Sequence, residues 1–375
     1  MKQWARVTAV VGLSALAVAA CGEAPDEAGA APEGDAPAAS GEATPEESAG
    51  GGGDAAADFT GCMVTDAGGV DDRSFNEAAD RGLTQAVDEL GIEKNVVESN
   101  AETDYTPNVE QLVQQDCDLI VGVGFLLMGA VGEAATANPE ETFALIDSTL
   151  EEPADNVKPL LFNTAEAAFL GGYLAAGMTE SGTVATFGGI PIPPVTIFMD
   201  GFVDGVAYHD EQKGTDVQVL GWDKDAQEGT FTGDFQNQAN GQTTTENFIS
   251  QGADIILPVA GPVGLGAAAA AEACGTARLI WVDSDGYESA SQYAPLFISS
   301  VLKNIDAAVF ATTQETVDGG FTSEPYVGTL ENGGVGLAPF HDFEDEVPEE
   351  LKTELTALQD AIVAGEVTVE SPASP

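Results

Sequence analysis

The sequence predicts an α/β fold in which two doubly wound lobes face each other across a cleft. From residue 59 onward, short and almost entirely apolar runs alternate with stretches of helical spacing. Continuous apolar strands of this kind are typical of a parallel sheet that helices cover on both faces. The alternation begins again after a small-residue helix at 165–178, and 375 residues are enough for two domains of ordinary size.

The chain begins with a segment typical of an export signal. Lys2 and Arg6 form a basic region, and an apolar or small run at 7–20 leads directly to Cys21. This run is too short for a bilayer core, which needs about 20 helical residues. The small residues before Cys21 resemble a bacterial lipobox, in which the cysteine is lipidated and becomes the new N-terminus. We therefore expect a lipoprotein signal peptide at 1–21 and anchoring to the extracytoplasmic face of the cell membrane through this lipid only. An ordinary secretory signal with an incidental cysteine is the alternative.

Residues 22–58 have the composition of a linker. They are almost wholly Ala, Gly, Pro, Ser, Thr and acidic residues, with ten acids and neither a basic nor an aromatic side chain. Such a segment cannot bury enough apolar surface to fold. We expect a disordered acidic linker between the lipid and the first strand.

The first lobe is predicted to contain five strands and two helices before residue 163. Its strands are the short apolar runs, and its first helix places Leu83, Val87 and Leu90 at helical spacing. In chain order we expect strands at 62–65, 95–98, 119–121, 143–146 and 160–162, with helices around 79–90 and 109–115.

The second lobe repeats this architecture without a detectable sequence repeat. We expect strands at 183–187, 217–220, 254–257 and 279–282, with helices around 196–208, 243–251 and 263–273. Strands near 160–163, 296–300 and 326–330 are expected to cross between the lobes, and a helix at 304–317 to return to the first. This organisation assigns residues 59–162 and about 301–325 to lobe 1, and 163–295 and about 331–370 to lobe 2.

Charge is the most unusual property of the chain. Asp and Glu number 63 against 11 Lys and Arg, a formal net charge of −52. A surface this acidic repels phosphate backbones, which excludes nucleic acid as a partner. Solubility, for example in a salty habitat, is the plain explanation, and attraction of cationic ligands is the alternative.

Carboxylates follow several predicted strands at the point where each strand ends. Asp66, Asp147 and Asp283 close apolar runs, and Asp285 comes two residues later. Ligands of open α/β sheets bind beyond the carboxyl ends of the strands, so these side chains are expected to line the cleft. Carboxylates accept hydrogen bonds from paired hydroxyls or ring N–H groups, as sugars and nucleobases present them. Turns and helix caps are the alternative use of aspartate here.

The segment at 66–77 indicates a helix start at the mouth of the cleft. Ser74 and Glu77 have the spacing of a capping box, which would put Phe75 and Asn76 in the first turn of the helix. A helix cap with Phe75 packed beneath it would produce the same pattern.

These residues resemble a known family. Residues 69–76 (GVDDRSFN) are similar to the G-x-x-D-[DK]-[KR]-S-F-N signature of the basic membrane protein family, lipid-anchored solute-binding proteins that include the bacterial purine nucleoside receptor. The likeness covers roughly Cys62 to Phe343. Further matches keep the family's order at 165–177 (AEAAFLGGYLAAG), 198–205 (FMDGFVDG), 252–256 (GADII), 259–264 (VAGPVG), 282–285 (VDSD) and 333–336 (GGVG).

The resemblance implies a type I periplasmic-binding-protein fold, a small-molecule ligand such as a purine nucleoside, and the permease subunits of an ABC importer as partners. Phe75 and Asn76 match the family's first stacking ring and its polar neighbour. Asp66 and Asp147 match acids of the first-lobe wall.

In the second lobe, the resemblance makes Phe235 the opposing ring, with Phe231 as the alternative because Asp234 departs from the family's serine. Asp283 matches the acid that holds the ribose, and Lys303 matches the ribose lysine. The spacing of this pair is slightly short, so Asp285 is an alternative acid.

Enzymatic function is not expected. The chain has two histidines, His209 and His341, and lacks the H-E-x-x-H, G-x-S-x-G and Walker A motifs. We therefore expect a monomeric binding protein with no catalytic residue, cofactor or metal. A ligand sensor that presents its solute to a receptor, and a glycosidase with two cleft carboxylates, are the alternatives.

The cysteines allow one internal disulfide once Cys21 is set aside. In a doubly wound sheet of strand order 2-1-3, the first and third strands are neighbours, about 4.8 Å apart. Cys62 near the start of the first strand and Cys117 just before the third would then meet at one edge, within disulfide range. Cys274 is expected to be a buried thiol, and three free cysteines are the alternative to the disulfide.

Overall fold

The computed structural model describes residue 56 and residues 58–375. The predicted signal peptide at 1–21, Cys21, and nearly all of the linker at 22–58 lie outside the described residues. Among the described residues, no helix has the length and the apolar character to span a membrane.

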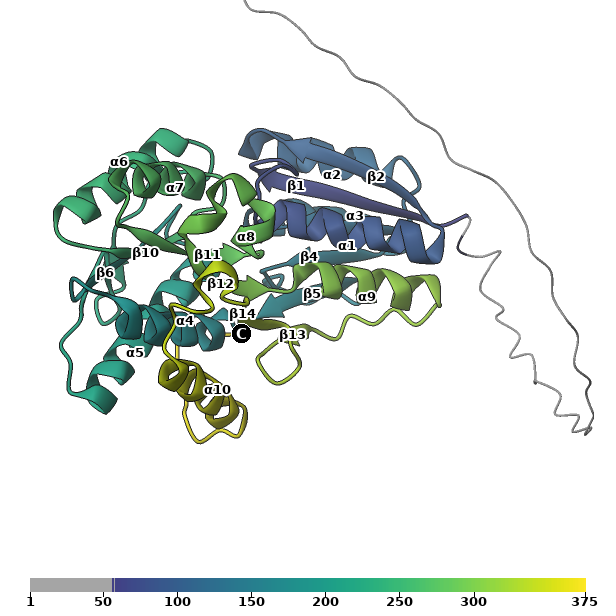
Figure 1. The fold of residues 1–375 in the computed structure, drawn as a ribbon. Helices are drawn as coiled ribbons and strands as arrows, with labels where there is room; N and C mark the ends of the chain where they lie inside the picture. Colours follow the sequence, from purple (N-terminus) through teal and green to yellow (C-terminus); the bar gives the residue numbers. More distant parts are fainter. Residues whose placement is uncertain (1–55, 57) are drawn as a thin grey trace, which may run out of the picture. The chain divides into compact units, whose positions relative to one another are not determined.

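The first lobe is built on a six-stranded parallel sheet in the order β13-β5-β4-β3-β1-β2 (Figure 1). Its strands are mostly buried because they are short runs of Val, Ile, Leu and Phe under helices. The strands are β1 (Thr60–Ala67), β2 (Glu93–Ser99), β3 (Leu119–Val123), β4 (Phe143–Ile146), β5 (Val157–Phe162) and β13 (Tyr326–Gly328). The helices are α1 (Phe75–Leu90), α2 (Tyr105–Val113), α3 (Met128–Ala137) and α9 (Ile305–Val317).

The second lobe has the sheet order β14-β12-β11-β10-β6-β7, parallel except for β14. Its strands are β6 (Thr183–Gly188), β7 (Gln218–Leu220), β10 (Ile255–Val259), β11 (Arg278–Asp283), β12 (Phe297–Lys303) and β14 (Val335–Leu337), with a small hairpin of β8 (Trp222–Asp223) and β9 (Glu228–Gly229). Its helices are α4 (Thr164–Met178), α5 (Pro193–Lys213), α6 (Gln238–Ser250), α7 (Val263–Cys274), α8 (Gly286–Ser289) and α10 (Glu349–Val363). Four 3-10 turns complete the described elements, η1 (Glu102–Asp104), η2 (Phe125–Leu127), η3 (Ser291–Leu296) and η4 (His341–Phe343).

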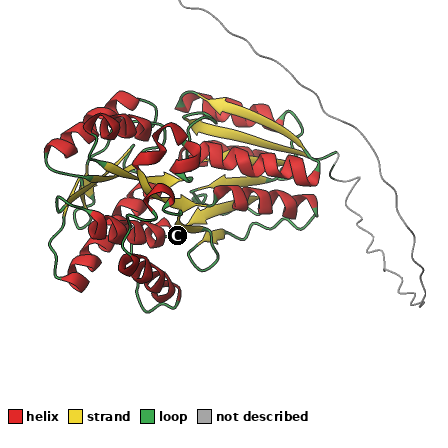
Figure 2. Cartoon of the chain, viewed as in Figure 1, coloured by secondary structure: helices red, strands yellow, loops and turns green. Residues whose placement is uncertain are grey.

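The predicted α/β class is confirmed, with helices around two mostly parallel sheets (Figure 2). Three segments connect the sheets, after β5, after β12 and between β13 and β14. The strand expected near 296–300 belongs to the second sheet, where β12 pairs with β11, and the chain leaves that sheet at Asn304. Backbone hydrogen bonds tie the connections together, from Asn163 N–H to the Gly328 carbonyl (2.8 Å) and from Asn304 N–H to the Gly334 carbonyl (2.9 Å).

Two glycines allow α4 and α5 to touch through their backbones. A Cβ on Gly172 would lie 2.0 Å from the Phe202 carbonyl oxygen, and a Cβ on Gly205 would lie 1.9 Å from the Phe169 carbonyl oxygen. No real side chain fits such distances, so the small residues of the two helices form their contact surface.

Cys62 and Cys117 are joined by a disulfide in the first lobe, with their Cα atoms 5.9 Å apart. Cys62 lies on β1 opposite Ile120 of β3, which places the bond at the edge of the sheet away from the strand ends that face the other lobe. The prediction that Cys274 is buried is wrong: this residue ends α7 and its thiol is exposed.

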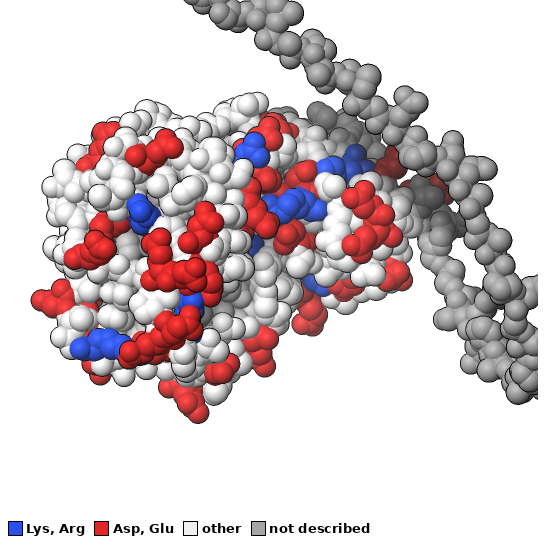
Figure 3. All heavy atoms as spheres, viewed as in Figure 1, with Lys and Arg blue, Asp and Glu red and all other residues white. Residues whose placement is uncertain are grey.

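The basic side chains are almost all paired with acids. Of the nine Lys and Arg among the described residues, eight lie within ion-pair distance of a carboxylate. Arg278 is the exception, and its guanidinium lies 5.6 Å from the centre of the Phe343 ring. Figure 3 shows Asp and Glu side chains spread over the visible face.

Candidate ligand-binding site

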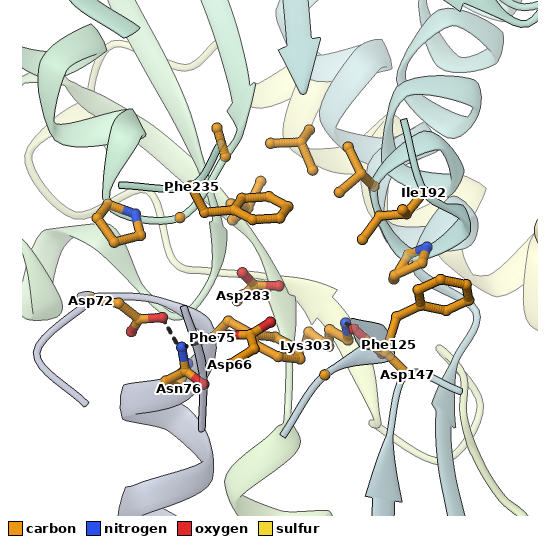
Figure 4. Close-up of a pocket in the computed structure, with 18 of the residues that line it drawn as sticks. Asp66, Asp72, Phe75, Asn76, Phe125, Asp147, Ile192, Phe235, Asp283 and Lys303 are labelled. Atoms are coloured by element: carbon orange, nitrogen blue, oxygen red, sulfur yellow. Dashed lines mark hydrogen bonds and ion pairs between the residues drawn. The ribbon is translucent and has the colours of Figure 1, made fainter. Parts of the chain in front are cut away.

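A cavity lies where the carboxyl ends of the strands of both lobes meet. The empty space between its side chains, open solvent at the mouth included, is about 560 Å³. Seven of the eight ligand-binding residues predicted from the sequence line this cavity (Figure 4), namely Asp66, Phe75, Asn76, Asp147, Phe235, Asp283 and Lys303.

The carboxylates reach the cavity because the strands that carry them end there. Asp66 lies near the end of β1, Asp147 directly follows β4, and Asp283 ends β11. Asp147 and Asp283 have φ of 66° and 65°, in the left-handed region that side-chain-bearing residues rarely adopt. Strained residues of this kind cluster at binding sites, where the surrounding structure holds them.

Asp66 and Asn76 form a buried polar pair on the first-lobe wall. The Asn76 Nδ2 group donates to Asp66 Oδ1 at 3.0 Å, and Asn76 Oδ1 is buried without a hydrogen-bond partner among the described residues. Burial raises the pKa of Asp66 to about 8, although the bond from Asn76 opposes this shift. Asp66 is therefore mostly protonated at neutral pH, and the pair offers a ligand both a donor and an acceptor.

Lys303 ends β12 and carries the positive charge of the cavity. Its ammonium pairs with the carboxylate of Asp147, and both side chains are almost fully buried. The same ammonium lies 4.8 Å from the centre of the Phe75 ring and 5.3 Å from that of Phe162. Burial raises the pKa of Asp147, and the charge of Lys303 opposes the rise.

Asp283 comes from the second lobe but is hydrogen-bonded to the first. Its Oδ2 accepts from the Ser74 hydroxyl at 2.7 Å. Burial raises the pKa of Asp283, against the charge of Lys303 and the bond from Ser74. Together, two acids and one ammonium can surround a pair of neighbouring hydroxyls.

The sequence left two candidates for the second ring and two for the ribose acid, and the structure places them differently. Phe235 lines the cavity on the side opposite Phe75 (Figure 4), whereas Phe231 packs edge-on against Trp222 with ring centres 5.9 Å apart and does not line it. Asp285, the eighth predicted residue, does not line the cavity either. It caps α8 by accepting from Tyr287 N–H and pairs with His341 Nε2 at 2.6 Å.

The prediction of a capping box at the start of α1 is wrong. Ser74 occupies the N-cap position, but its side chain caps no backbone group. Asp72 caps the helix instead, because its carboxylate accepts from the backbone N–H groups of Ser74 (3.0 Å), Asn76 (2.8 Å) and Glu77 (3.0 Å). Burial raises the pKa of Asp72 to about 6, although these three bonds lower it.

Sequence reasoning missed several lining residues. Asp72 could have been noticed as a second acid within the same motif, and the paired prolines at 193–194 mark the start of α5, which borders the cavity. The remaining apolar wall is assembled from segments far apart in the sequence, by Phe125, Ile192, Val195, Phe198 and Pro262. Of these, Phe198 and Pro262 fall within segments that resemble the family. No cluster of three or more metal-ligating side chains occurs among residues 58–375.

A small-molecule cavity between the strand ends of two α/β lobes defines a solute-binding protein with the type I periplasmic-binding-protein fold. The chain belongs to the family of PnrA-like ABC transporter substrate-binding proteins, whose model matches residues 59–372. Membership confirms the family resemblance and the expectation of a binding protein rather than an enzyme. It also implies a small-molecule ligand and the permease of an ABC transporter as partner.

Individual relatives agree with this assignment. The ABC transporter nucleoside-binding protein BmpA of Lactococcus lactis is 30% identical over 332 residues, which cover 84% of this chain and 90% of that protein. An uncharacterised lipoprotein of Pyrococcus abyssi is 33% identical over 282 residues, 73% of this chain and 67% of that one. The crystal structure of an ABC transporter solute-binding protein from Aeropyrum pernix K1 superimposes with a TM-score of 0.76 at 27% identity, and covers 84% of this chain and 94% of that one.

Proposed function

We propose that this protein captures a nucleoside, with purine nucleosides preferred, and delivers it to an ABC importer. It acts as a monomer held at the extracytoplasmic face of the membrane by a lipid on Cys21. The observation that carries the proposal is the arrangement of Phe75 and Phe235 on opposite sides of one cavity that also holds Asp283, Lys303 and Asp147. The Lactococcus lactis relative, which is named as nucleoside-binding, supports it.

Each part of the cavity suits one part of a nucleoside. A base stacked on an aromatic ring gains about 1–3 kcal/mol per ring, as alanine substitution shows in single-strand nucleic-acid binders. The edge of the base would meet Asp66 and Asn76, where Asn76 Oδ1 still needs a donor. The two ribose hydroxyls would lie between Asp283 and Lys303, which can accept from and donate to them.

Calorimetry with ribonucleosides, free bases and sugars tests this proposal. Phe75→Ala should weaken nucleoside binding by about 1–3 kcal/mol, because one stacking partner is lost. Asp283→Asn should weaken ribonucleosides more than the corresponding free bases. Phe231→Ala is the matched control for the rings, since Phe231 does not line the cavity. Equal losses for ribonucleosides and free bases in Asp283→Asn would refute the ribose assignment.

Anchoring is tested separately in cells. Cys21→Ser removes the proposed acceptor thiol, so the variant should fail to incorporate labelled palmitate and should accumulate as precursor or shed protein. Unchanged palmitate incorporation would refute the assignment of Cys21.

A further inference from the structure

Ser74 makes its side-chain contacts across the cleft. It precedes α1 in the first lobe and is fully buried. Its hydroxyl donates to Asp283 Oδ2 at 2.7 Å and lies 3.2 Å from the carbonyl oxygen of Val282, both in the second lobe. No other hydrogen bond within residues 58–375 reaches the Asp283 carboxylate, so Ser74 is its single partner there.

The Ser74 hydroxyl is free to contact Asp283 because the Asp72 carboxylate caps α1 in its place. A serine at an N-cap normally accepts from the second or third backbone N–H of the helix. Here the Asp72 carboxylate accepts from the N–H groups of Asn76 and Glu77, so these donors are already satisfied. The Ser74 side chain can therefore turn away from its own helix and toward the second lobe.

Backbone carbonyl groups at and next to Ser74 make further hydrogen bonds between the two lobes. The carbonyl oxygen of Arg73 accepts from Trp281 Nε1 at 3.2 Å and from the Ser289 hydroxyl at 2.9 Å. The Ser284 hydroxyl donates to the Ser74 carbonyl oxygen at 3.1 Å. Arg73 adopts a φ of 62°, in the left-handed region, within this corner.

We propose that Ser74 is a positioning residue that couples the approach of the two lobes to the orientation of Asp283. When the lobes are together, the Ser74 hydroxyl holds one oxygen of Asp283 and leaves the other for the ligand. When the lobes separate, Asp283 loses the hydrogen bond from Ser74, and the first-lobe wall of the cavity moves away from it. The proposal rests on the proposed function, in which Asp283 holds the ribose hydroxyls.

This coupling has a kinetic consequence. A bond that forms only after the lobes meet does not affect the first encounter with the ligand, but it must break before the ligand leaves. Differences in affinity between related complexes mostly lie in the dissociation rate. Removal of the Ser74 hydroxyl should therefore accelerate dissociation of the ligand.

A double-mutant cycle tests the coupling. Ser74→Ala should weaken ribonucleoside binding by roughly tenfold or more, since a hydrogen bond to a charged group is lost. Asp283→Asn should weaken it as well, and the double variant should be no weaker than Asp283→Asn alone, because Ser74 acts through Asp283. Ser250→Ala on α6 is the matched control, since that hydroxyl is exposed and bonds only within its own helix.

Two further measurements separate positioning from a merely structural role. Stopped-flow kinetics should place the loss in the dissociation rate, and binding of the free base should change less than binding of the ribonucleoside. Small-angle scattering of the ligand-free Ser74→Ala protein should show a larger radius of gyration than the wild type. Ser289→Ala, which weakens the same corner without touching Asp283, should enlarge the radius with a smaller loss of affinity.

The outcomes are distinguishable from failure of the proposed function. If the wild-type protein binds no nucleoside, the proposed function is wrong, while scattering still tests whether Ser74 holds the lobes together. If the wild type binds nucleosides and the effects of Ser74→Ala and Asp283→Asn simply add, Ser74 does not act through Asp283. An unchanged dissociation rate in Ser74→Ala would also overturn the proposal.

Discussion

Replacement of Lys303 by methionine should produce a loss of stability that depends on pH. Lys303→Met keeps most of the length of the side chain but removes the charge that pairs with Asp147, and the two groups are 3% and 7% exposed. Breaking a buried pair by removing one partner costs about 3–5 kcal/mol, because the other charge remains uncompensated. The loss of the ammonium beside Phe75 and Phe162 adds about 0.5–2 kcal/mol.

The dependence of this stability loss on pH shows whether the uncompensated charge of Asp147 causes it. Burial raises the pKa of Asp147 in the folded protein, and without Lys303 nothing comparable opposes it. Below the unfolded pKa of about 4, Asp147 is protonated in both states and adds no penalty. As pH rises above that value, the unfolded state loses the proton while the folded state retains it, so stability falls by about 1.4 kcal/mol per pH unit until the folded pKa is reached.

Urea unfolding at pH 4 and at pH 7 measures this effect. The difference between wild type and Lys303→Met should be about 0.5–2 kcal/mol at pH 4, where only the contact with the rings is lost, and larger by about 3–5 kcal/mol at pH 7. The double variant Lys303→Met/Asp147→Asn should recover most of the loss at pH 7, because the carboxylate that paired directly with Lys303 is no longer left uncompensated. An equal loss at both pH values would show that methionine disturbs packing rather than charge, and would refute this reasoning.

Three more predictions address the cavity, the helix contact and the disulfide. Because the pKa of Asp66 is raised to about 8, its contribution to wild-type stability should fall as pH rises from about 4 to 8. Asp66→Asn should remove this contribution and change the slope of stability against pH in urea titrations; an unchanged slope would contradict it. Gly205→Ala should lower the unfolding free energy by about 1–3 kcal/mol through its clash with the Phe169 carbonyl. The matched helical control Gly129→Ala, whose Cβ would meet nothing within 4 Å, should be neutral or stabilising, and similar losses in both would refute the contact. A non-reducing peptide map should link Cys62 to Cys117, and their reduction should cost about 2–4 kcal/mol; alkylation of both in unreduced, denatured protein would exclude the bond.

The architecture could be predicted because periodicity is a local property. Continuous apolar strands and helical spacing indicated a parallel α/β sheet, and aspartates at strand ends indicated the cleft side of each lobe. Asp66, Asp147 and Asp283 therefore line the cavity as predicted. The ring on the second lobe and the lysine depended on the family resemblance, since neither Phe235 nor Lys303 has a distinctive local pattern.

The predictions from the sequence that failed did so for physical reasons that a single sequence does not show. Ser74 and Asp72 could both cap α1, and the choice depends on Asp283, 209 positions further along the chain. Cys274 ends an alanine-rich helix in which nearly every position is apolar, so composition alone does not show which face is buried. Asp285 has the sequence context of a ligand-binding acid, but its carboxylate instead caps the start of α8 and pairs with His341.

The pairing of nearly every basic side chain means that mobile counterions must neutralise the remaining carboxylates. At 0.01 M salt the screening length is about 30 Å, so repulsion among surface acids extends across a whole lobe, whereas at 0.15 M it falls to about 8 Å. The protein should thus resist urea better as ionic strength rises, whereas the buried pair of Lys303 and Asp147 lies out of reach of the solvent ions. Global stability and ligand affinity should consequently respond differently to added salt.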